Sequence, residues 1–184
     1  MDNPFPTKKY DVIHIDPPWP IQLMSRKVRP NQKKMPYDVE KFEDIKKFPV
    51  ESIANDDCFM FMWTTHKWLP KAFELVEHWG FNYNCCITWD KGVGFTPMGF
   101  MWSTEFCLFC IKKGNTARLK KLGEKTIISA KSKAHSRKPD AIFNLINKTC
   151  EGSKIDLFGR TKRAGWDVWG DDVKLQAETL EDYC

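Results

Sequence analysis

A short apolar segment that ends in two prolines constrains the fold of this chain more than any other feature. Residues Tyr10–Ile15 form an apolar run typical of a buried strand, and Asp16-Pro17-Pro18-Trp19 follows directly. Because proline fixes φ and carries no N–H, the two prolines cannot extend a sheet. The strand must therefore end in a rigid bend that presents a carboxylate. Open α/β sheets bind ligands at such carboxyl ends of strands, so we expect a functional site here.

The bend carries groups that assist methyl transfer to an exocyclic amine of an aromatic base. Such an amine is a weak nucleophile, because its lone pair is delocalised into the ring. The Asp16 carboxylate and the Pro17 carbonyl can accept both amino hydrogens and stabilise the positive charge that grows during attack. Trp19 can stack on the extruded base, and alignment with a methyl donor supplies further rate. The alternative is an Asp-initiated turn with a tryptophan in the core.

Strands alternate with helices along the chain, and no internal repeat is visible. The apolar patterns predict strands at 11–15, 58–63, 81–89, 104–112 and, as the final strand, 154–158. They predict helices at 39–48, at 67–79 and from Pro139 to about 150–152. Strands interleaved with crossover helices indicate a three-layer α/β fold, with a mostly parallel sheet and an antiparallel strand pair late in the chain.

The composition fits one compact domain. The chain has 184 residues, of which 42% are hydrophobic and 14% aromatic, which is enough for one full core. We expect a single domain over residues 1–170 and an acidic tail over 171–184. Seven cysteines, the lack of a recognisable signal peptide and the lack of a long apolar stretch favour a reducing, cytoplasmic location with no membrane partner.

Basic residues gather in two segments. Lys and Arg number 29 against 24 Asp and Glu, a net charge of +5, and residues 112–138 contain ten bases and one acid. A second unopposed group follows the bend and consists of Arg26, Lys27, Arg29, Lys33 and Lys34. Backbone charge supplies most of the sequence-independent affinity for nucleic acid, so both segments predict a groove that tracks phosphates, with the second group binding substrate. The alternative is a pair of solvated loops; the stretch 24–38 is also long enough to act as a lid.

Two patterns resemble metal sites only weakly. Cys107 and Cys110 have the spacing of half a zinc site, but they lie in a probable strand, where residues three apart point to opposite faces. Asp140, Glu151 and Lys154 resemble a metal-dependent nuclease core, but the spacing is Glu-x-x-Lys instead of Glu-x-Lys. We therefore expect no metal, and we keep the nuclease only as a remote alternative.

Further motifs follow the bend in a fixed order. They are Met35-Pro36-Tyr37, Phe61-Met62-Trp63-Thr64-Thr65, His78-Trp79-Gly80-Phe81, Ile87-Thr88-Trp89-Asp90-Lys91, Glu105, His135-Ser136-Arg137-Lys138-Pro139-Asp140, Asp156-Leu157-Phe158-Gly159-Arg160 and Gly165-Trp166-Asp167-Val168-Trp169-Gly170. Together with the bend, this series resembles the adenine-N6 methyltransferase family named for the seventy-kilodalton subunit of the messenger-RNA enzyme, in its compact bacterial or phage form. The resemblance implies a Rossmann-like fold that uses S-adenosylmethionine, with a permuted order of motifs, in the cytoplasm of a bacterial or phage-infected cell.

The resemblance also implies individual site residues. It places Asp16, Pro17, Pro18 and Trp19 in catalysis and Tyr37 beside the acceptor base. The implied cofactor-binding residues are Asp16, Lys138, Phe158 and Arg160. Lys138 and Arg160 can hold a carboxylate or hydroxyls, and an aromatic face such as that of Phe158 can line the site of a sulfonium. The alternative places Phe158 in the core and the two cations on the surface.

The chain departs from the family pattern in two places. Members usually carry an asparagine after the last motif, where this chain has Gly170-Asp171-Asp172. A hydrogen bond from this position to the cofactor's ribose would therefore have a different donor character. Larger relatives also have a segment before the first strand that holds the cofactor's adenine. The adenine pocket is therefore unassigned in this sequence.

The implied function is methylation of the N6 amine of adenine in nucleic acid. We favour DNA over RNA because the chain is a minimal form without an evident RNA-binding segment. A base in duplex DNA has to be extruded before it reaches such a site. The alternatives are an RNA adenine-N6 methyltransferase and a non-catalytic nucleic-acid-binding subunit of a methyltransferase complex. The chain could act as a homodimer or with a partner subunit in each of these functions.

Overall fold

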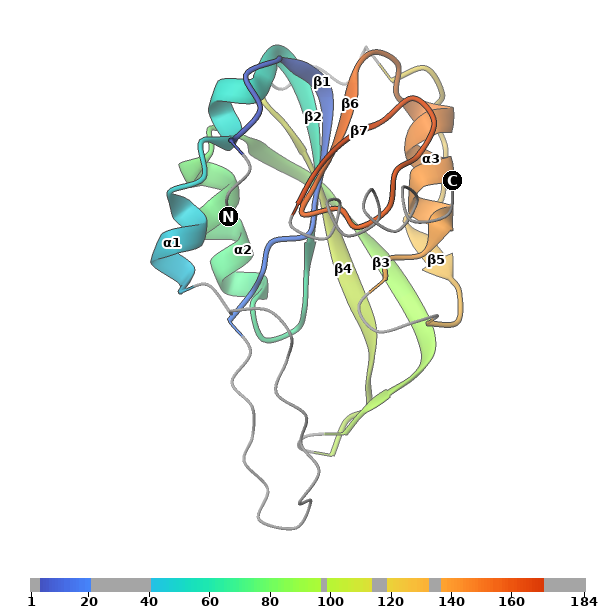
Figure 1. The fold of residues 1–184 in the computed structure, drawn as a ribbon. Coiled ribbons are helices and arrows are strands. Elements are labelled where there is room, and N and C mark those ends of the chain that lie inside the picture. Colours follow the sequence, from blue (N-terminus) through green and yellow to red (C-terminus); the bar gives the residue numbers. More distant parts are fainter. Residues whose placement is uncertain (1–3, 21–40, 97–98, 114–118, 133–136, 171–184) are drawn as a thin grey trace, which may run out of the picture.

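The structure is a computed structural model that describes residues 4–20, 41–96, 99–113, 119–132 and 137–170. Within these ranges a central sheet of seven strands has the order β5-β3-β4-β2-β1-β6-β7 (Figure 1). The strands are β1 (Tyr10–Ile15), β2 (Ala54–Thr64), β3 (Asn82–Phe95), β4 (Trp102–Ile111), β5 (Ile127–Ser129), β6 (Lys154–Leu157) and β7 (Asp167–Trp169). β4 is antiparallel to both neighbours, β2 and β3, whereas the other pairs are parallel.

Helices cover both faces of this sheet. The helices are α1 (Phe42–Lys46), the 3-10 helix η1 (Val50–Ile53), α2 (Leu69–His78) and α3 (Asp140–Thr149). Figure 1 shows α1 and α2 on one face and α3 on the other. Strand alternation divides the core accordingly: Ile13 and Ile15 pack with the side of α1 and α2, whereas Val12 packs with the side of α3. The predicted three-layer α/β fold is confirmed.

Several details differ from the sequence-based expectations. The antiparallel strands β3 and β4 lie in the middle of the chain, not late in it, and β3 continues to Phe95. β5 and β7 have three residues each and were not predicted. Residues 154–158 are therefore not the final strand. α1 is shorter than the helix predicted for 39–48, of which residues 39 and 40 lie outside the described ranges.

The carboxyl ends of the parallel strands share one edge of the sheet. Asp16, Thr65 and Phe158 follow β1, β2 and β6 at this edge, and the antiparallel β4 begins there. Cys107 and Cys110 of β4 belong to the cores on opposite faces, as the strand spacing predicts. In the described part of the chain, none of the helices has the length and apolar character needed to span a bilayer.

Candidate active site

The Asp16-Pro17-Pro18-Trp19 bend is fixed by hydrogen bonds and by packing. The Trp19 amide donates to the Pro17 carbonyl at 2.7 Å, which closes a tight turn, and the Trp19 indole N–H donates to the Trp63 carbonyl at 2.9 Å. The Trp19 ring is 8% exposed and stacks on Trp68 at 5.9 Å between ring centroids. Trp19 thus anchors the bend to the end of β2, as the core-tryptophan alternative requires. Its stacking on a base stays a prediction, and the Pro17 carbonyl keeps a second lone pair.

Lys138 lies between two carboxylates at the edge of the sheet. Its Nζ atom is 3.0 Å from Asp16 Oδ2 and 3.0 Å from Glu105 Oε2. Lys91 Nζ lies 3.1 Å from the other oxygen of Glu105. The Lys138 ammonium also lies 5.2 Å from the centre of the Trp63 ring, within reach of a cation–π contact. The bend, β3, β4 and the segment before α3 are therefore connected through one partly buried ion network.

The charges in this network shift each other's titration. Burial raises the pKa of the Asp16 carboxyl above its ordinary value of 3.8, and the ion pair with Lys138 offsets only part of that effect. Burial also acts to raise the pKa of Glu105, but Lys138 and Lys91 outweigh it and hold this pKa below 4.5. For Lys138, burial lowers the pKa, whereas the two carboxylates raise it to a net value above 10.5. Lys138 therefore stays charged at neutral pH, and Asp16 is the carboxylate poised to take up a proton.

A second buried network joins β1 to β6. His14 is 2% exposed, and its Nδ1 lies 2.7 Å from Asp156 Oδ1. The Trp63 indole N–H donates to His14 Nε2 at 2.7 Å. Because Nε2 accepts this bond, the imidazole proton is on Nδ1 and is donated to Asp156. This arrangement holds the carboxylate of Asp156 in place next to the loop that follows β6.

Arg163 completes the second network from the loop after β6. Its guanidinium donates to Asp156 Oδ2 at 3.3 Å and lies 3.6 Å from the centre of the Phe143 ring. A further nitrogen lies 3.6 Å from Asp140 at the start of α3. Arg163 thus ties the loop 158–165 to both β6 and α3.

The loop after β6 begins with an unusual backbone conformation. Phe158 has a φ of +60°, a value rarely adopted by residues other than glycine. Its ring packs edge-on against Phe48 and Trp169. A side chain on Gly159 would lie 2.5 Å from the Asp156 carboxylate, and one on Gly170 would lie 2.7 Å from the Gly159 carbonyl. Backbone conformations like that of Phe158 cluster at ligand sites, where surrounding contacts maintain them.

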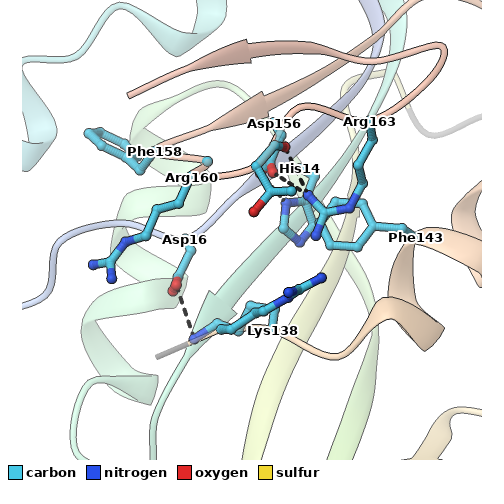
Figure 2. Close-up of a pocket in the computed structure, with 11 residues that line it drawn as sticks. His14, Asp16, Lys138, Phe143, Asp156, Phe158, Arg160 and Arg163 are labelled. Atoms are coloured by element: carbon cyan, nitrogen blue, oxygen red, sulfur yellow. Dashed lines mark hydrogen bonds and ion pairs between the residues drawn. The ribbon is translucent and has the colours of Figure 1, made fainter. Parts of the chain in front are cut away.

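A cavity of about 250 Å³ lies between these networks. Its lining residues are His14, Asp16, Arg137, Lys138, Phe143, Asp156, Phe158, Gly159, Arg160, Thr161 and Arg163. Figure 2 shows the ion pair of Asp16 with Lys138 on one side of the cavity and the Asp156 contacts with His14 and Arg163 on another. All four residues proposed to bind the cofactor, Asp16, Lys138, Phe158 and Arg160, line this one space.

The proposed substrate-binding residues are not all placed. Tyr37, Arg26, Lys27, Arg29, Lys33 and Lys34 lie outside the described residues, so their roles stay predictions. The described residues of the basic segment 112–138, which exclude 114–118 and 133–136, are spread over both ends of the sheet. Lys112 and Lys113 follow β4 at the sheet edge opposite Asp16 and pair with Glu51 and Asp56, whereas Lys138 lies at the site.

Several cavity residues were not predicted as site residues. His14, Phe143, Asp156 and Arg163 line the cavity, and Glu105 holds Lys138. A signal existed for two of them, because Glu105 and Asp156 belong to the motifs that carry the family resemblance. His14 looked like one more position of an apolar strand, since nothing local marks its two partners.

The lining residues fit the methionine and ribose parts of S-adenosylmethionine. Lys138, Arg137 and Arg160 are suitable for a carboxylate, Asp16 and Asp156 can accept from an ammonium or from hydroxyls, and Phe158 offers an aromatic face. The cavity is close to the lower end of the range of about 300–1,000 Å³ for small-molecule sites. The adenine part of the cofactor has no assigned residues here.

The chain is similar to known methyltransferases. The MT-A70 family profile matches residues 10–172. The type II methyltransferase M.MunI of Mycoplasma sp. is 31% identical over 91% of this chain and 79% of its own length. The N(6)-adenosine-methyltransferase subunit METTL3 of Danio rerio is 29% identical over 83% of this chain, and the RNA methyltransferase MTA1 of Cryphonectria parasitica is 25% identical over 89%.

The extent of these matches differs between relatives. The chain spans about a quarter of METTL3, where the match covers 26% of the protein, and about half of MTA1, where it covers 52%. The family profile, by contrast, extends from the first residue of β1 to beyond β7 and includes every element that contributes to the cavity. The strand that ends in Asp16, the Lys138 segment and the loop after β6 thus lie within the matched residues, and the chain belongs to the MT-A70 family of methyltransferases.

Proposed function

We propose that this protein transfers a methyl group from S-adenosylmethionine to the N6 amine of adenine in nucleic acid, with DNA as the favoured substrate. The observation that carries the proposal is the Asp16–Lys138 ion pair at the edge of a cavity that also contains Phe158 and Arg160. It places an acceptor for an amine and the residues suited to a methyl donor around one space. Family membership supports the same reaction class.

Asp16 and Pro17 would activate the amine. Lys138 holds Oδ2 of Asp16, which leaves Oδ1 to accept one amino hydrogen, and the Pro17 carbonyl accepts the other. These two bonds draw the nitrogen toward tetrahedral geometry and stabilise the charge that develops as the N–C bond forms. The nitrogen must then lose a proton, and the raised pKa of Asp16 makes this carboxylate a suitable first acceptor. Trp19 holds the bend in place for this step.

The cofactor would supply an electrophilic methyl group on a sulfonium. Lys138 and Arg160 would bind its carboxylate, Asp156 would accept hydrogen bonds from ribose hydroxyls, and Phe158 would line the adenosyl side. The contacts of His14 and Arg163 keep Asp156 fixed for that task. Alignment of donor and amine in one cavity would provide most of the remaining rate.

The identities to known relatives support the preference for DNA. The chain shares 31% identity with a relative named a type II methyltransferase, and 25–29% with relatives whose names specify adenosine or RNA. RNA therefore stays as the second candidate substrate. The two differ at the 2′-hydroxyl, which RNA presents and DNA lacks.

The test measures methyl transfer from a tritiated donor to matched DNA and RNA oligonucleotides. We expect 6-methyl-deoxyadenosine in the DNA digest and at least a hundredfold loss with Asp16→Ala. Methylated adenosine in RNA alone would replace DNA with RNA as the substrate. Equal incorporation by the wild type and Asp16→Ala, together with retained oligonucleotide binding, would favour a non-catalytic binding subunit.

A further inference from the structure

The tryptophans of this chain divide into two groups by burial. The chain has eight, and six of them are buried in the cores: Trp19, Trp63, Trp79, Trp89, Trp166 and Trp169. The other two, Trp68 and Trp102, are partly exposed. Both lie at the sheet edge that carries Asp16, since Trp68 follows β2 and Trp102 begins β4. Partly exposed indoles concentrated beside a catalytic edge are typical of a surface that binds a flat ligand.

His66 lies two residues before Trp68 in the chain and packs against Trp102. It contacts Trp102 with a centroid distance of 5.1 Å and an interplanar angle of 31°. Its Nε2 hydrogen-bonds Thr104 at 2.9 Å, and its ring packs edge-on against Phe106. Trp68 closes the turn after β2, where its amide donates to the Thr65 carbonyl at 3.1 Å. We refer to His66, Trp68 and Trp102 as the aromatic ledge.

The ledge contacts the catalytic bend through Trp68. Trp68 stacks on Trp19, with rings 15° from parallel. Thr104, which bonds His66, is followed in β4 by Glu105 on the opposite face of the strand, and Glu105 bonds Lys138 and through it reaches Asp16. A nucleic acid with its adenine at Asp16 would therefore place a neighbouring nucleotide near the ledge. Figure 1 shows the β3–β4 hairpin extending past the ends of β1 and β2 at this edge.

Two lysines lie close to the ledge. Lys67 Nζ lies 5.8 Å from the centre of the Trp68 ring, and Lys91, which pairs with Glu105, lies close enough to affect His66. Burial, and then the charge of Lys91, lower the pKa of His66. His66 is therefore neutral at physiological pH and acts as an aromatic surface, while the lysines carry the positive charge. Apolar Phe100 and Met101, 83% and 53% exposed, continue this surface toward the hairpin tip.

We propose that the aromatic ledge is a stacking subsite for a nucleotide that flanks the acceptor adenine, with Lys67 and Lys91 close to its phosphate. The inference deepens the proposed function and depends on it for the position of the acceptor. Base-on-aromatic stacking tolerates any base, so the subsite supplies affinity for an unstacked strand more than sequence preference. The subsite therefore does not select a recognition sequence.

The test measures binding separately from catalysis. Fluorescence anisotropy of a labelled single-stranded oligonucleotide gives Kd for the wild type, Trp102→Ala, Trp102→Phe and Trp68→Ala. We expect Trp102→Ala and Trp68→Ala each to weaken binding about tenfold, and Trp102→Phe to retain most of the affinity. The matched control is Tyr83→Ala, because Tyr83 is 44% exposed at the opposite edge of the sheet. It should change Kd less than twofold.

Two further measurements separate the possible outcomes. In methyl transfer, the Trp102 variants should raise KM for the oligonucleotide and leave kcat and the affinity for S-adenosylmethionine unchanged, which also shows that they fold. Trp68→Ala should raise KM and also lower kcat, because Trp68 stacks on Trp19 of the bend. Wild-type methylation with unaltered Kd and KM in the ledge variants would overturn the ledge but not the proposed function. If the wild type transfers no methyl but the ledge variants bind the oligonucleotide more weakly than the wild type, the ledge is sustained and the proposed reaction is overturned.

A different occupant of the ledge would give a distinct result. If a second copy of the chain covers it, sedimentation would show a dimer that Trp102→Ala converts to a monomer while Kd for the oligonucleotide stays the same. That result, or the absence of oligonucleotide binding by the wild type, would overturn the inference.

Discussion

Trp63 donates its indole N–H to Nε2 of His14 at 2.7 Å, and this bond determines which nitrogen of His14 carries the proton. The Nδ1–H is thereby directed at Asp156, whose other oxygen accepts from Arg163. The three bonds run from the end of β2 through β1 to the end of β6. The position of the carboxylate in the cavity thus depends on a side chain buried in the sheet.

Replacement of His14 should destabilise the whole fold. His14→Ala leaves the Trp63 N–H and the Asp156 carboxylate without their partner in a buried position, and we expect a loss of about 3 kcal/mol in the free energy of unfolding. Urea denaturation measures it. His78→Ala is the control, since His78 is exposed and bonds only a backbone carbonyl among its described contacts, and it should cost less than about 0.5 kcal/mol. Equal stabilities of the two variants would contradict the role assigned to His14.

The pH dependence of methyl transfer should reflect the titration of the Asp16 carboxyl group. In the proposed mechanism, activity needs the ionised carboxylate, so it should fall as the pH drops through the pKa of Asp16, which burial places above 3.8. The charge of Glu105 helps to raise that pKa. Glu105→Gln should therefore move the acid limb of the kcat/KM profile to lower pH. A shift to higher pH would show that Glu105 acts on Asp16 mainly through Lys138.

The stability of the protein should depend on pH through the same carboxylate. Because the pKa of Asp16 is raised in the folded state, its protonated form contributes stability that is complete below about 3.8 and is lost as the pH rises through the raised pKa. The difference in unfolding free energy between the wild type and Asp16→Asn should thus move against the wild type as the pH rises through that range. A difference that is constant with pH would mean that Asp16 titrates normally in the folded protein.

Gly159 should be needed for the shape of the proposed cofactor site. An alanine Cβ would lie 2.5 Å from Asp156 Oδ2 and 3.0 Å from the Val168 side chain, so Asp156 would have to move. We expect Gly159→Ala to weaken S-adenosylmethionine binding, measured by calorimetry, at least tenfold. Gly123→Ala is the control: its φ is +80° and its Cβ meets open space, so it should cost about 1 kcal/mol of stability and leave the affinity unchanged.

Elements with strong local signals were predictable from the sequence. β1 ends where Asp16 and the two prolines require it to end, and α2 and α3 have apolar residues at helical spacing. β5 and β7 were not predicted because each has only three residues. β5 pairs with the longer strand β3, and β7 pairs with the longer strand β6. A strand of that length leaves no periodic pattern to detect.

The residues of the candidate site were predictable where short motifs contain them. Asp16, Lys138, Phe158 and Arg160 belong to such motifs, and the fold brings them to one cavity. His14 was not predictable, because its partners Trp63 and Asp156 are 49 and 142 residues away in the chain. The environment of Trp19 was equally hidden: its burial depends on Trp68, which packs against it only in the folded protein.

The most direct test of the account compares the wild type with Asp16→Asn, which keeps the shape of the side chain and removes its charge. Nucleosides from DNA and RNA of cells expressing each protein are analysed separately by mass spectrometry. The account predicts 6-methyl-deoxyadenosine in the DNA of wild-type cells and its loss, by at least a hundredfold, in Asp16→Asn cells. Equal amounts of methylated adenine in both strains, or none in either, would contradict it.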